Sequence, residues 1–294
     1  VVATAVGWAA AVTITRRLGA LETAARRIAA GEFDQPIGDQ SPDELGRLGR
    51  AFDLMQTRLS QVDRARKDFI ANASHELRTP LFTLGGFLEL LGDEDLDEDT
   101  RAEFLATMRE QVTRLTKLAT DLLDLSRLDA GAVAIAHEPI DMRASARSLV
   151  REFRGLAARH GSRVVLVRGD GDVVAVGDEE RVQQIGRALL DNAVRHNPEG
   201  TQVRVAVERI DDVIALIVSD DGPGLDPSVR DHLFERFVRG EGAAGSGSGL
   251  GLAIARELAQ RMDGTLTVGS SSGETSFRLE LPAEQAAAGA PVPA

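Results

Sequence analysis

The sequence predicts a multidomain fold in which bundle-forming helices are followed by one α/β domain. In the first 130 residues, apolar side chains recur at alternating steps of three and four, as in helices that share a packed seam. After about Val133, strand-like apolar runs at residues 163–167, 203–207, 213–218 and 275–281 alternate with helical stretches near residues 145–158, 179–195 and 253–261, which is typical of a sheet covered by helices. The 294 residues suffice for about two domains, and a hydrophobic fraction of 43% supports a packed core.

The first fifteen residues, Val1 to Thr15, carry no charge and are followed directly by Arg16 and Arg17. A membrane-spanning helix needs about 20 apolar residues, so this stretch is too short alone, and it lacks the basic start of a signal peptide. A basic flank is typical of the cytoplasmic side of a membrane. We expect the end of a transmembrane helix, which would place the chain at the inner or plasma membrane facing the cytoplasm. An Ala-rich helical leader is the alternative.

Composition restricts the classes of function. The net charge of −12 and the pI near 5.0 disfavour direct nucleic-acid binding, which requires a basic face. The chain has no cysteine, which excludes disulfides, thiolate metal sites and cysteine nucleophiles. A cysteine-free chain also fits a cytoplasmic compartment.

Two heptad-patterned helices are predicted after the apolar start, separated by the helix breakers Gly31 and Pro36. Asp43 and Glu44 suit the positive end of the second helix, where it begins. Two short helices bury little area on their own, so self-association is expected. The seam residues are Leu18, Leu21, Ala25 and Ile28 in the first helix and Leu45, Leu48, Phe52, Met55, Leu59 and Val62 in the second.

A helical hairpin is predicted next. Its first helix carries Ile70, Leu77, Leu84 and Leu91 at steps of seven, with Leu81 and Leu88 beside them on the seam. This register slips by one residue from the preceding seam. An acidic turn over residues 92–99 leads to a second helix with the same alternating spacing, from Leu105 to Leu122. Two such hairpins, one from each of two chains, would form a four-helix bundle.

His75 lies at an outward position of this hairpin. Glu76 is its neighbour, and Thr79 follows one helical turn later on the same face. Neutral imidazole can act as a nucleophile near pH 7, and a carboxylate can take or orient its ring proton. On spacing alone, however, an exposed His–Glu pair on a helix is more often solvated surface than a functional site.

The surrounding motif gives His75 a more specific interpretation. SHELRTPL, residues 74–81, resembles the phosphoacceptor box of sensor histidine kinases, and DLLDLSRLDAG, residues 121–131, resembles the end of its second helix. The resemblance implies that His75 is phosphorylated on a ring nitrogen, that Glu76 is its base, and that Thr79 positions water to dephosphorylate the partner. The heptad helices before it, with DELG at residues 43–46, resemble a HAMP signalling linker.

Three motifs in the second half of the chain suggest a nucleotide. Asn192 offers an amide oxygen suited to Mg²⁺, and Arg195 suits phosphate. Asp220 follows a strand and could accept from an exocyclic amine. Glycine-rich backbone at the start of a helix can bind an anion. Each of these motifs alone, however, is more often a turn or a linker. The motifs are LLDNAVRHNPEG at 189–200, VSDDGPGL at 218–225 and GSGSGLGL at 245–252.

In this order the motifs resemble the N, G1 and G2 boxes of the Bergerat ATP-binding fold, with LFERFVRG at 233–240 resembling the F box. The resemblance implies ATP and Mg²⁺ as cofactors, with Asn192 holding the metal and Asp220 recognising the adenine amino group. It also implies a mobile ATP lid. The other nucleotide-site residues that it implies are Arg195, His196, Gly222, Gly224, Phe234, Arg236, Arg239, Gly247, Gly249, Leu250, Gly251, Leu252 and Thr275.

Together the resemblances imply an α-helical HAMP linker and a dimeric four-helix-bundle phosphoacceptor domain, followed by an α/β sandwich ATP-binding domain of the Bergerat fold. The expected boundaries are 1–15 for the end of the transmembrane helix, 16–67 for the HAMP linker, 68–131 for the dimerisation and phosphotransfer hairpin, 132–284 for the ATP-binding domain and 285–294 for a disordered tail.

The expected function is that of a homodimeric, membrane-bound sensor histidine kinase. It would phosphorylate His75 from ATP, transfer the phosphoryl group to an aspartate of a response-regulator receiver domain, and also act as that regulator's phosphatase. Two alternatives remain open from the sequence: a nucleotide-regulated scaffold or phosphatase-dominant module, and a gyrase- or chaperone-like ATPase. The stimulus, the regulator's identity and the choice between cis and trans transfer are not encoded in these motifs.

Overall fold

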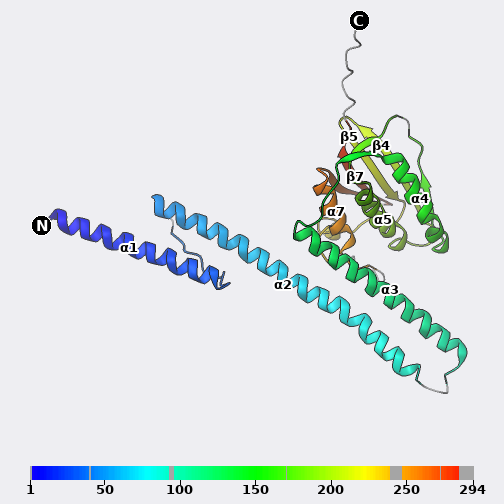
Figure 1. The fold of residues 1–294 in the computed structure, drawn as a ribbon, viewed down its shortest axis with the longest axis horizontal. Coiled ribbons are helices and arrows are strands. Elements are labelled where there is room, and N and C mark those ends of the chain that lie inside the picture. The colour runs from blue at the N-terminus through cyan, green and yellow to red at the C-terminus, as the bar shows by residue number, and fades with distance from the viewer. Residues whose placement is uncertain are drawn as a thin grey trace, which may run out of the picture. The chain divides into compact units, whose positions relative to one another are not determined.

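A computed structural model describes residues 2–39, 41–92, 96–169, 171–238, 247–271 and 273–284. The chain divides into two compact units, Val1–His75 and Glu76–Ala294. Figure 1 traces the helices and strands in chain order. The tail predicted for residues 285–294 lies outside the described residues.

The first unit contains α1 (Val2–Ala29) and the start of α2 (Glu44–Leu90). α1 runs without a break through the predicted border at residue 15. Within the described part of the chain, no helix is both long enough and apolar enough to span a membrane. The transmembrane assignment of residues 1–15 therefore stays a prediction.

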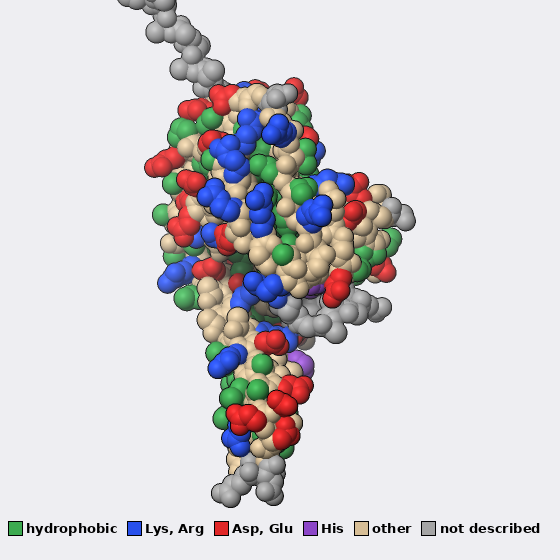
Figure 2. Space-filling view, turned by 90° about the vertical axis from the view of Figure 1, so that its right-hand side faces the viewer, with side chains coloured by type: hydrophobic (Ala, Val, Ile, Leu, Met, Phe, Trp, Pro, Cys, Tyr) green, Lys and Arg blue, Asp and Glu red, His purple; other side chains and the backbone are tan. Residues whose placement is uncertain are grey.

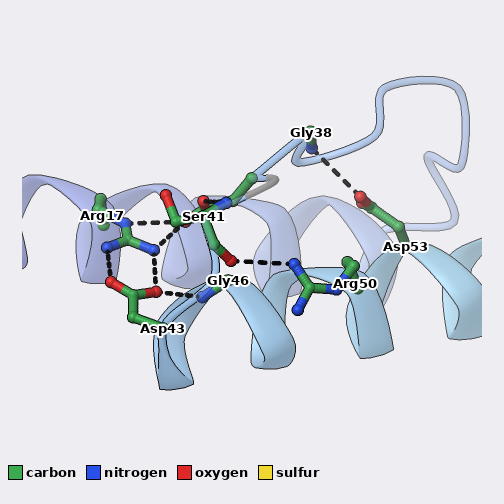
Figure 3. Close-up of polar contacts among 8 residues, drawn as sticks. Arg17, Gly38, Ser41, Asp43, Gly46, Arg50 and Asp53 are labelled. Carbon is green, nitrogen blue, oxygen red and sulfur yellow. Dashed lines mark hydrogen bonds and ion pairs between the residues drawn. The ribbon is translucent and has the colours of Figure 1, made fainter.

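Polar contacts hold the connector between these helices against α1 (Figure 3). The guanidinium of Arg17 pairs with Asp39 at 2.7 Å and with Asp43 at 2.5 Å. Asp43 Oδ1 also accepts from the backbone N of Gly46 at 2.9 Å, so the aspartate caps the first turn of α2. A Cβ at Gly46 would overlap Ser41 O, which explains why glycine stands in the DELG motif.

α2 is one continuous helix of 47 residues, whereas the sequence predicted two helices with a change of register between them. No glycine or proline lies between Leu59 and Phe69, so the helix has no breaker where the change of register is predicted. Pro80 lies inside α2 and is buried.

The predicted hairpin is confirmed. α3 (Glu98–Asp129) begins at the N-cap Asp97, whose side chain accepts from Thr100 N at 2.9 Å. Phe87 and Phe104 pack across the hairpin with ring centroids 4.9 Å apart. Several large apolar side chains of the hairpin remain exposed in the single chain, namely Leu81, Phe82, Leu88, Leu90, Leu105, Val112 and Leu123.

The α/β domain is built on a five-stranded sheet in the order β2-β4-β5-β7-β6. β2 pairs in parallel with β4, and the other pairs are antiparallel. A separate pair, β1 with β3, is antiparallel. The strands are β1 (Glu138–Asp141), β2 (Arg163–Leu166), β3 (Val174–Gly177), β4 (Gln202–Ile210), β5 (Val213–Asp220), β6 (Thr265–Ser271) and β7 (Glu274–Pro282).

Three amphipathic helices pack on this sheet: α4 (Met142–Arg159), α5 (Glu179–Arg195) and α7 (Gly251–Arg261). The short α6 (Pro227–Arg230) follows β5. α4 and α5 approach closely, because a Cβ at Gly186 would overlap the side chain of Leu149. Fully buried core side chains include Leu149, Ile185, Leu189, Leu190, Ile214, Leu216 and Phe277.

The outer face of α4 is basic. Its arginines Arg147, Arg151, Arg154 and Arg159 are exposed. On the face shown in Figure 2, Lys and Arg side chains lie over the middle of the upper part and acidic side chains lie along its margins. This solvated face contrasts with the apolar face of α4 that packs on the sheet.

The predicted strands near residues 163–167, 203–207, 213–218 and 275–281 and the predicted helices near 145–158, 179–195 and 253–261 are all present. β1, β3, β6 and α6 were not predicted from the sequence. β1 and β3 have four residues each, too few to establish a pattern, and β6 is polar with a central Gly269.

Candidate nucleotide-binding site

A cavity of ≈ 1080 Å³ opens between α5, the loop after β5 and the start of α7. This volume is slightly above the range found for small-molecule sites, about 300–1,000 Å³. The sequence-predicted residues that line it are Asn192, Arg195, His196, Asp220, Gly224, Gly247, Gly249, Gly251, Leu252 and Thr275.

One end of the cavity presents a buried acceptor. Asp220 ends β5 with 2% of its surface exposed, and it stands opposite Thr275 in the β5–β7 register. Burial raises the pKa of Asp220, although hydrogen bonds from Gly222 N and from Asn197 act in the other direction. A carboxylate in this setting gains from a further donor, such as the exocyclic amine of a base.

A side chain at position 222 would displace the side chains of Asn197 and Asp220. A Cβ there would overlap Asn197 Oδ1, and it would come within 2.8 Å of Asp220 Oδ1. Gly224 has a φ of +86°, and a Cβ there would lie 2.6 Å from Ser271 O. Both glycines let the loop after β5 close under the cavity, although Gly222 itself does not line it.

The other end of the cavity lies at the C-terminal half of α5. Asn192 lines the cavity, and its neighbour Asp191 holds Arg195 Nε at 2.5 Å. His196 caps the helix, and its ring lies 3.5 Å from where a Cβ of Gly247 would stand. The N-box residues and the glycine-rich loop therefore meet at one place, as the motif order predicted.

The glycine-rich loop is fixed where it enters α7. Ser248 Oγ accepts from Leu250 N at 3.2 Å, and it donates to Asp121 Oδ2 of α3 at 2.7 Å. Gly249 has a φ of +69°, and its carbonyl accepts from Phe237 N at 2.8 Å. Leu250 is fully buried and does not line the cavity.

Of the F-box residues predicted to bind nucleotide, Phe234 and Arg236 are described and lie outside the cavity lining, whereas Leu233 and Val238 of the same box line it. Phe234 packs edge-on against Phe277, with centroids 6.4 Å apart and Arg256 over its ring. Arg236 makes a bidentate contact with Asp129 of α3, at 2.9 and 2.6 Å. Arg239 lies outside the described residues. The nucleotide roles of all three stay predictions.

Sequence reasoning did not anticipate several residues of the cavity. Lys117 and Asp121 come from α3, and Asn197 bonds to Asp220. His232 also lines the cavity, and its hydrogen bond to Glu235 raises the pKa of its imidazole. Asn197 lies inside the N-box motif and could have been named from it, whereas no motif connects α3 to this cavity.

The phosphoacceptor candidates lie on α2. His75 and Thr79 are exposed and one helical turn apart. Glu76 is half-buried, and its carboxylate lies 3.4 Å from the guanidinium of Arg114 on α3.

A metal at the cavity would depend on few protein ligands. In the described part of the chain, no group of three or more His, Asp or Glu side chains is arranged to hold an ion. The Asn192 amide at the cavity wall fits Mg²⁺, which binds few protein groups and completes its shell with phosphate oxygens and water.

Segments of the chain match three protein families. Residues 177–285 match HATPase_c, the histidine kinase-, DNA gyrase B- and HSP90-like ATPases. Residues 65–131 match HisKA, the His Kinase A phospho-acceptor domain, and residues 10–61 match the HAMP domain. The chain belongs to the HAMP-containing sensor histidine kinases. The HisKA match separates it from the gyrases and chaperones that share the ATPase fold.

Named histidine kinases are similar over most of this chain. BaeS of Escherichia coli (strain K12) is 34% identical over 263 residues, covering 88% of this chain and 56% of BaeS. The histidine-protein kinase/phosphatase MprB of Mycolicibacterium smegmatis (strain ATCC 700084 / mc(2)155) is 36% identical over 301 residues, covering 97% of this chain and 59% of MprB. The chain thus spans a little over half the length of these relatives.

Solved histidine kinases share the fold. AdeS of Acinetobacter baumannii superposes with a TM-score of 0.59 at 25% identity, covering 72% of this chain and 98% of the AdeS structure. Full-length ShkA in complex with AMPPNP superposes with a TM-score of 0.56 at 30% identity, covering 75% of this chain and 47% of that structure. The helical hairpin followed by the α/β ATPase domain is therefore the histidine kinase architecture.

Proposed function

We propose that this chain autophosphorylates His75 from ATP and passes the phosphoryl group to an aspartate of a response-regulator receiver domain. The proposal rests on the cavity in which the buried Asp220, Asn192 and the glycine-rich loop converge. The HisKA segment of the same chain presents an exposed His75. The AMPPNP complex of ShkA supports an adenine nucleotide as the ligand.

Different residues of the cavity bind different parts of ATP. Asp220, beside Thr275, accepts from the adenine amino group. Arg195 and His196 at the end of α5 face the phosphates, and the backbone N–H groups that open α7 offer further donors to them. When bound, Mg²⁺ would neutralise charge on the phosphates, with Asn192 as its protein ligand.

At His75 the chemistry is an in-line displacement. A ring nitrogen attacks the γ-phosphorus, an N–P bond forms, and the P–O bond to ADP breaks. Glu76 accepts or orients the proton on the other ring nitrogen, and Arg114 fixes the direction of that carboxylate. Transfer to the regulator then exchanges the N–P bond for an acyl phosphate on aspartate.

A homodimer attached to a membrane is part of this proposal. The HisKA match and the exposed apolar side chains of the hairpin support the dimer. The uncharged residues 1–15 and the HAMP match support attachment through a transmembrane helix that leads into the HAMP segment.

Labelling with γ-labelled ATP tests the kinase assignment. The wild-type chain should acquire acid-labile, alkali-stable label, and His75→Gln should acquire none. Asn192→Asp should lose Mg²⁺-dependent labelling, and Asp220→Asn should weaken nucleotide binding. Free phosphate without protein label would indicate an ATPase, and neither product would indicate a scaffold.

A phosphatase role for Thr79 can be separated from the kinase role of His75. Thr79→Ala removes one hydroxyl and keeps a good helix former, so the hairpin should persist. We expect this variant to retain His75 labelling and transfer but to prolong the lifetime of the phosphorylated regulator. The relative MprB is named as a histidine-protein kinase/phosphatase, which supports the second activity. If Thr79→Ala dephosphorylates the regulator as fast as the wild type, Thr79 has no such role.

A further inference from the structure

Helix α3 of the phosphoacceptor hairpin supplies two side chains to the wall of the nucleotide cavity. Lys117 and Asp121 are four residues apart, so they lie one turn apart on the same face of the helix. Asp121 bonds to Ser248 of the glycine-rich loop, and Lys117 reaches across to α5. α3 therefore contacts both sides of the cavity.

Lys117 lies at the end where phosphates are expected. Its Nζ is 2.6 Å from Asp191 Oδ2, and Asp191 Oδ1 is 2.5 Å from Arg195 Nε. The carboxylate of Asp191 therefore pairs with two cations. Asp191 directly precedes Asn192 in the sequence. Burial alone would raise the pKa of Asp191, but the hydrogen bonds and charges of Lys117 and Arg195 lower it, so this carboxylate stays ionised near neutral pH.

These cations matter for binding an anionic ligand because the cavity lining as a whole is slightly negative. Counting the Lys, Arg and Asp side chains alone, the lining has a formal excess of one negative charge, because it contains the cations Lys117, Arg187 and Arg195 and the carboxylates Asp121, Asp191, Asp220 and Asp226. Arg187 is held at 2.9 Å by Glu152 on the outer surface. Lys117 and Arg195 remain the cations at the Asp191 end of the described lining.

We propose that Lys117 is a nucleotide-binding residue, contributed by the hairpin rather than by the ATP domain, whose ammonium exchanges Asp191 for the polyphosphate of bound ATP. This rests on the proposed function, since it assumes that the cavity binds an adenine nucleotide. With 47% of its side chain exposed, Lys117 has room to turn from the carboxylate to a phosphate oxygen. An ammonium on a flexible stem suits this exchange.

A chemical test is direct because the chain has two lysines, Lys67 and Lys117. The probe is ATP with an acyl group on its terminal phosphate. A nearby lysine amine attacks the acyl carbon, the C–O bond to phosphate breaks, ATP leaves, and an amide stays on the lysine. Lys67 lies in the other unit, pairs with Asp63 and is 73% exposed, so it reports the background rate in the same molecule.

We expect the full chain to be acylated at Lys117 well above Lys67, with excess ATP suppressing the label at Lys117 and leaving that at Lys67 unchanged. Mass spectrometry of arginine-cleaved peptides locates the label. If displacement of a fluorescent ATP analogue detects no nucleotide binding, this proposal and the proposed function both fail. If nucleotide binds but Lys117 is labelled no faster than Lys67, this proposal alone fails.

Substitutions provide a second, independent measurement. Lys117→Ala should weaken ATP binding by about tenfold, the cost of one charged hydrogen bond. Lys117→Arg should stay within about threefold of the wild type because it keeps a cation there. The matched control is Lys67→Ala, which removes the other lysine and should leave ATP affinity unchanged.

Asp191→Asn separates phosphate binding from simple docking of α3 on the ATP domain. It removes the ion pair to Lys117 but keeps the ammonium and frees it for phosphate. We expect ATP to bind this variant at least as tightly as the wild type. If Asp191→Asn instead reproduces the loss seen in Lys117→Ala, the lysine acts only as a docking residue and the proposal is wrong.

Discussion

The α/β domain and the heptad helices bury their apolar side chains in different ways. In the domain, Leu189, Leu190 and Leu216 are fully buried by residues of the same chain. On the helices, Leu59 is 38% exposed and Leu88 is 61% exposed. In both regions the helices show a regular apolar pattern in the sequence. The difference shows that a regular seam predicts a helix but does not establish that one chain alone can cover it.

The largest difference between the regions should appear in core truncation. Leu189→Ala should lower the free energy of unfolding of the α/β domain by about 3 kcal/mol, because α4, α5 and the sheet cannot fully close the space that it leaves. The measurement is urea unfolding followed by circular dichroism. The control is Leu54→Ala, an exposed leucine off the seam, which should cost less than about 0.5 kcal/mol. If Leu189→Ala and Leu54→Ala lowered the free energy of unfolding equally, the contrast between the two regions would be wrong.

The helical region should instead be sensitive in its association. Leu88→Asp should raise the dimer dissociation constant by at least about tenfold, since each subunit would bring one charge to an apolar seam. Light scattering over a dilution series measures it. Leu90→Asp, two residues along and also exposed, should change association less because Leu90 lies off the seam. Association unaffected by Leu88→Asp would place the dimer seam elsewhere on the hairpin.

The smallest effect concerns two carboxylates whose pKa values shift in opposite directions. Burial raises the pKa of Asp220 above its ordinary 3.8, so the folded state binds more protons than the unfolded state, and stability falls as pH rises above that value. Hydrogen bonds from Thr100 lower the pKa of Asp97 below 3.8, so its contribution is lost as pH falls through this lower range.

Near neutral pH, nucleotide-free Asp220→Asn should therefore be slightly more stable than the wild type, and Asp97→Asn slightly less stable. Both differences should shrink as the pH falls below about 4. Thermal unfolding across a pH series measures them. If both variants changed stability in the same direction relative to the wild type, the two carboxylates would not lie in contrasting environments.

The parts of the site that could be predicted are those within one motif. Asp220, Asn192 and the glycines were predicted from three motifs that together, in this order, resemble an ATP-binding fold. The same resemblance added Thr275, which the β5–β7 register sets opposite Asp220. Lys117 could not be found this way, because it lies 74 residues before its partner Asp191. Which face of α3 meets the ATP domain depends on tertiary packing, which local periodicity does not specify.

The short edge strand β2 has a consequence for a dimeric chain. Two ATP domains tethered in one dimer would face each other at an effective concentration on the order of millimolar, far above that of free molecules. An open sheet edge at that concentration invites pairing between the two sheets. β2 limits this risk because it has four residues, begins at Arg163 and is followed closely by Arg168, whereas the opposite edge strand, β6, is interrupted by Gly269. The sheet can therefore be held close to its copy without templating an aggregate.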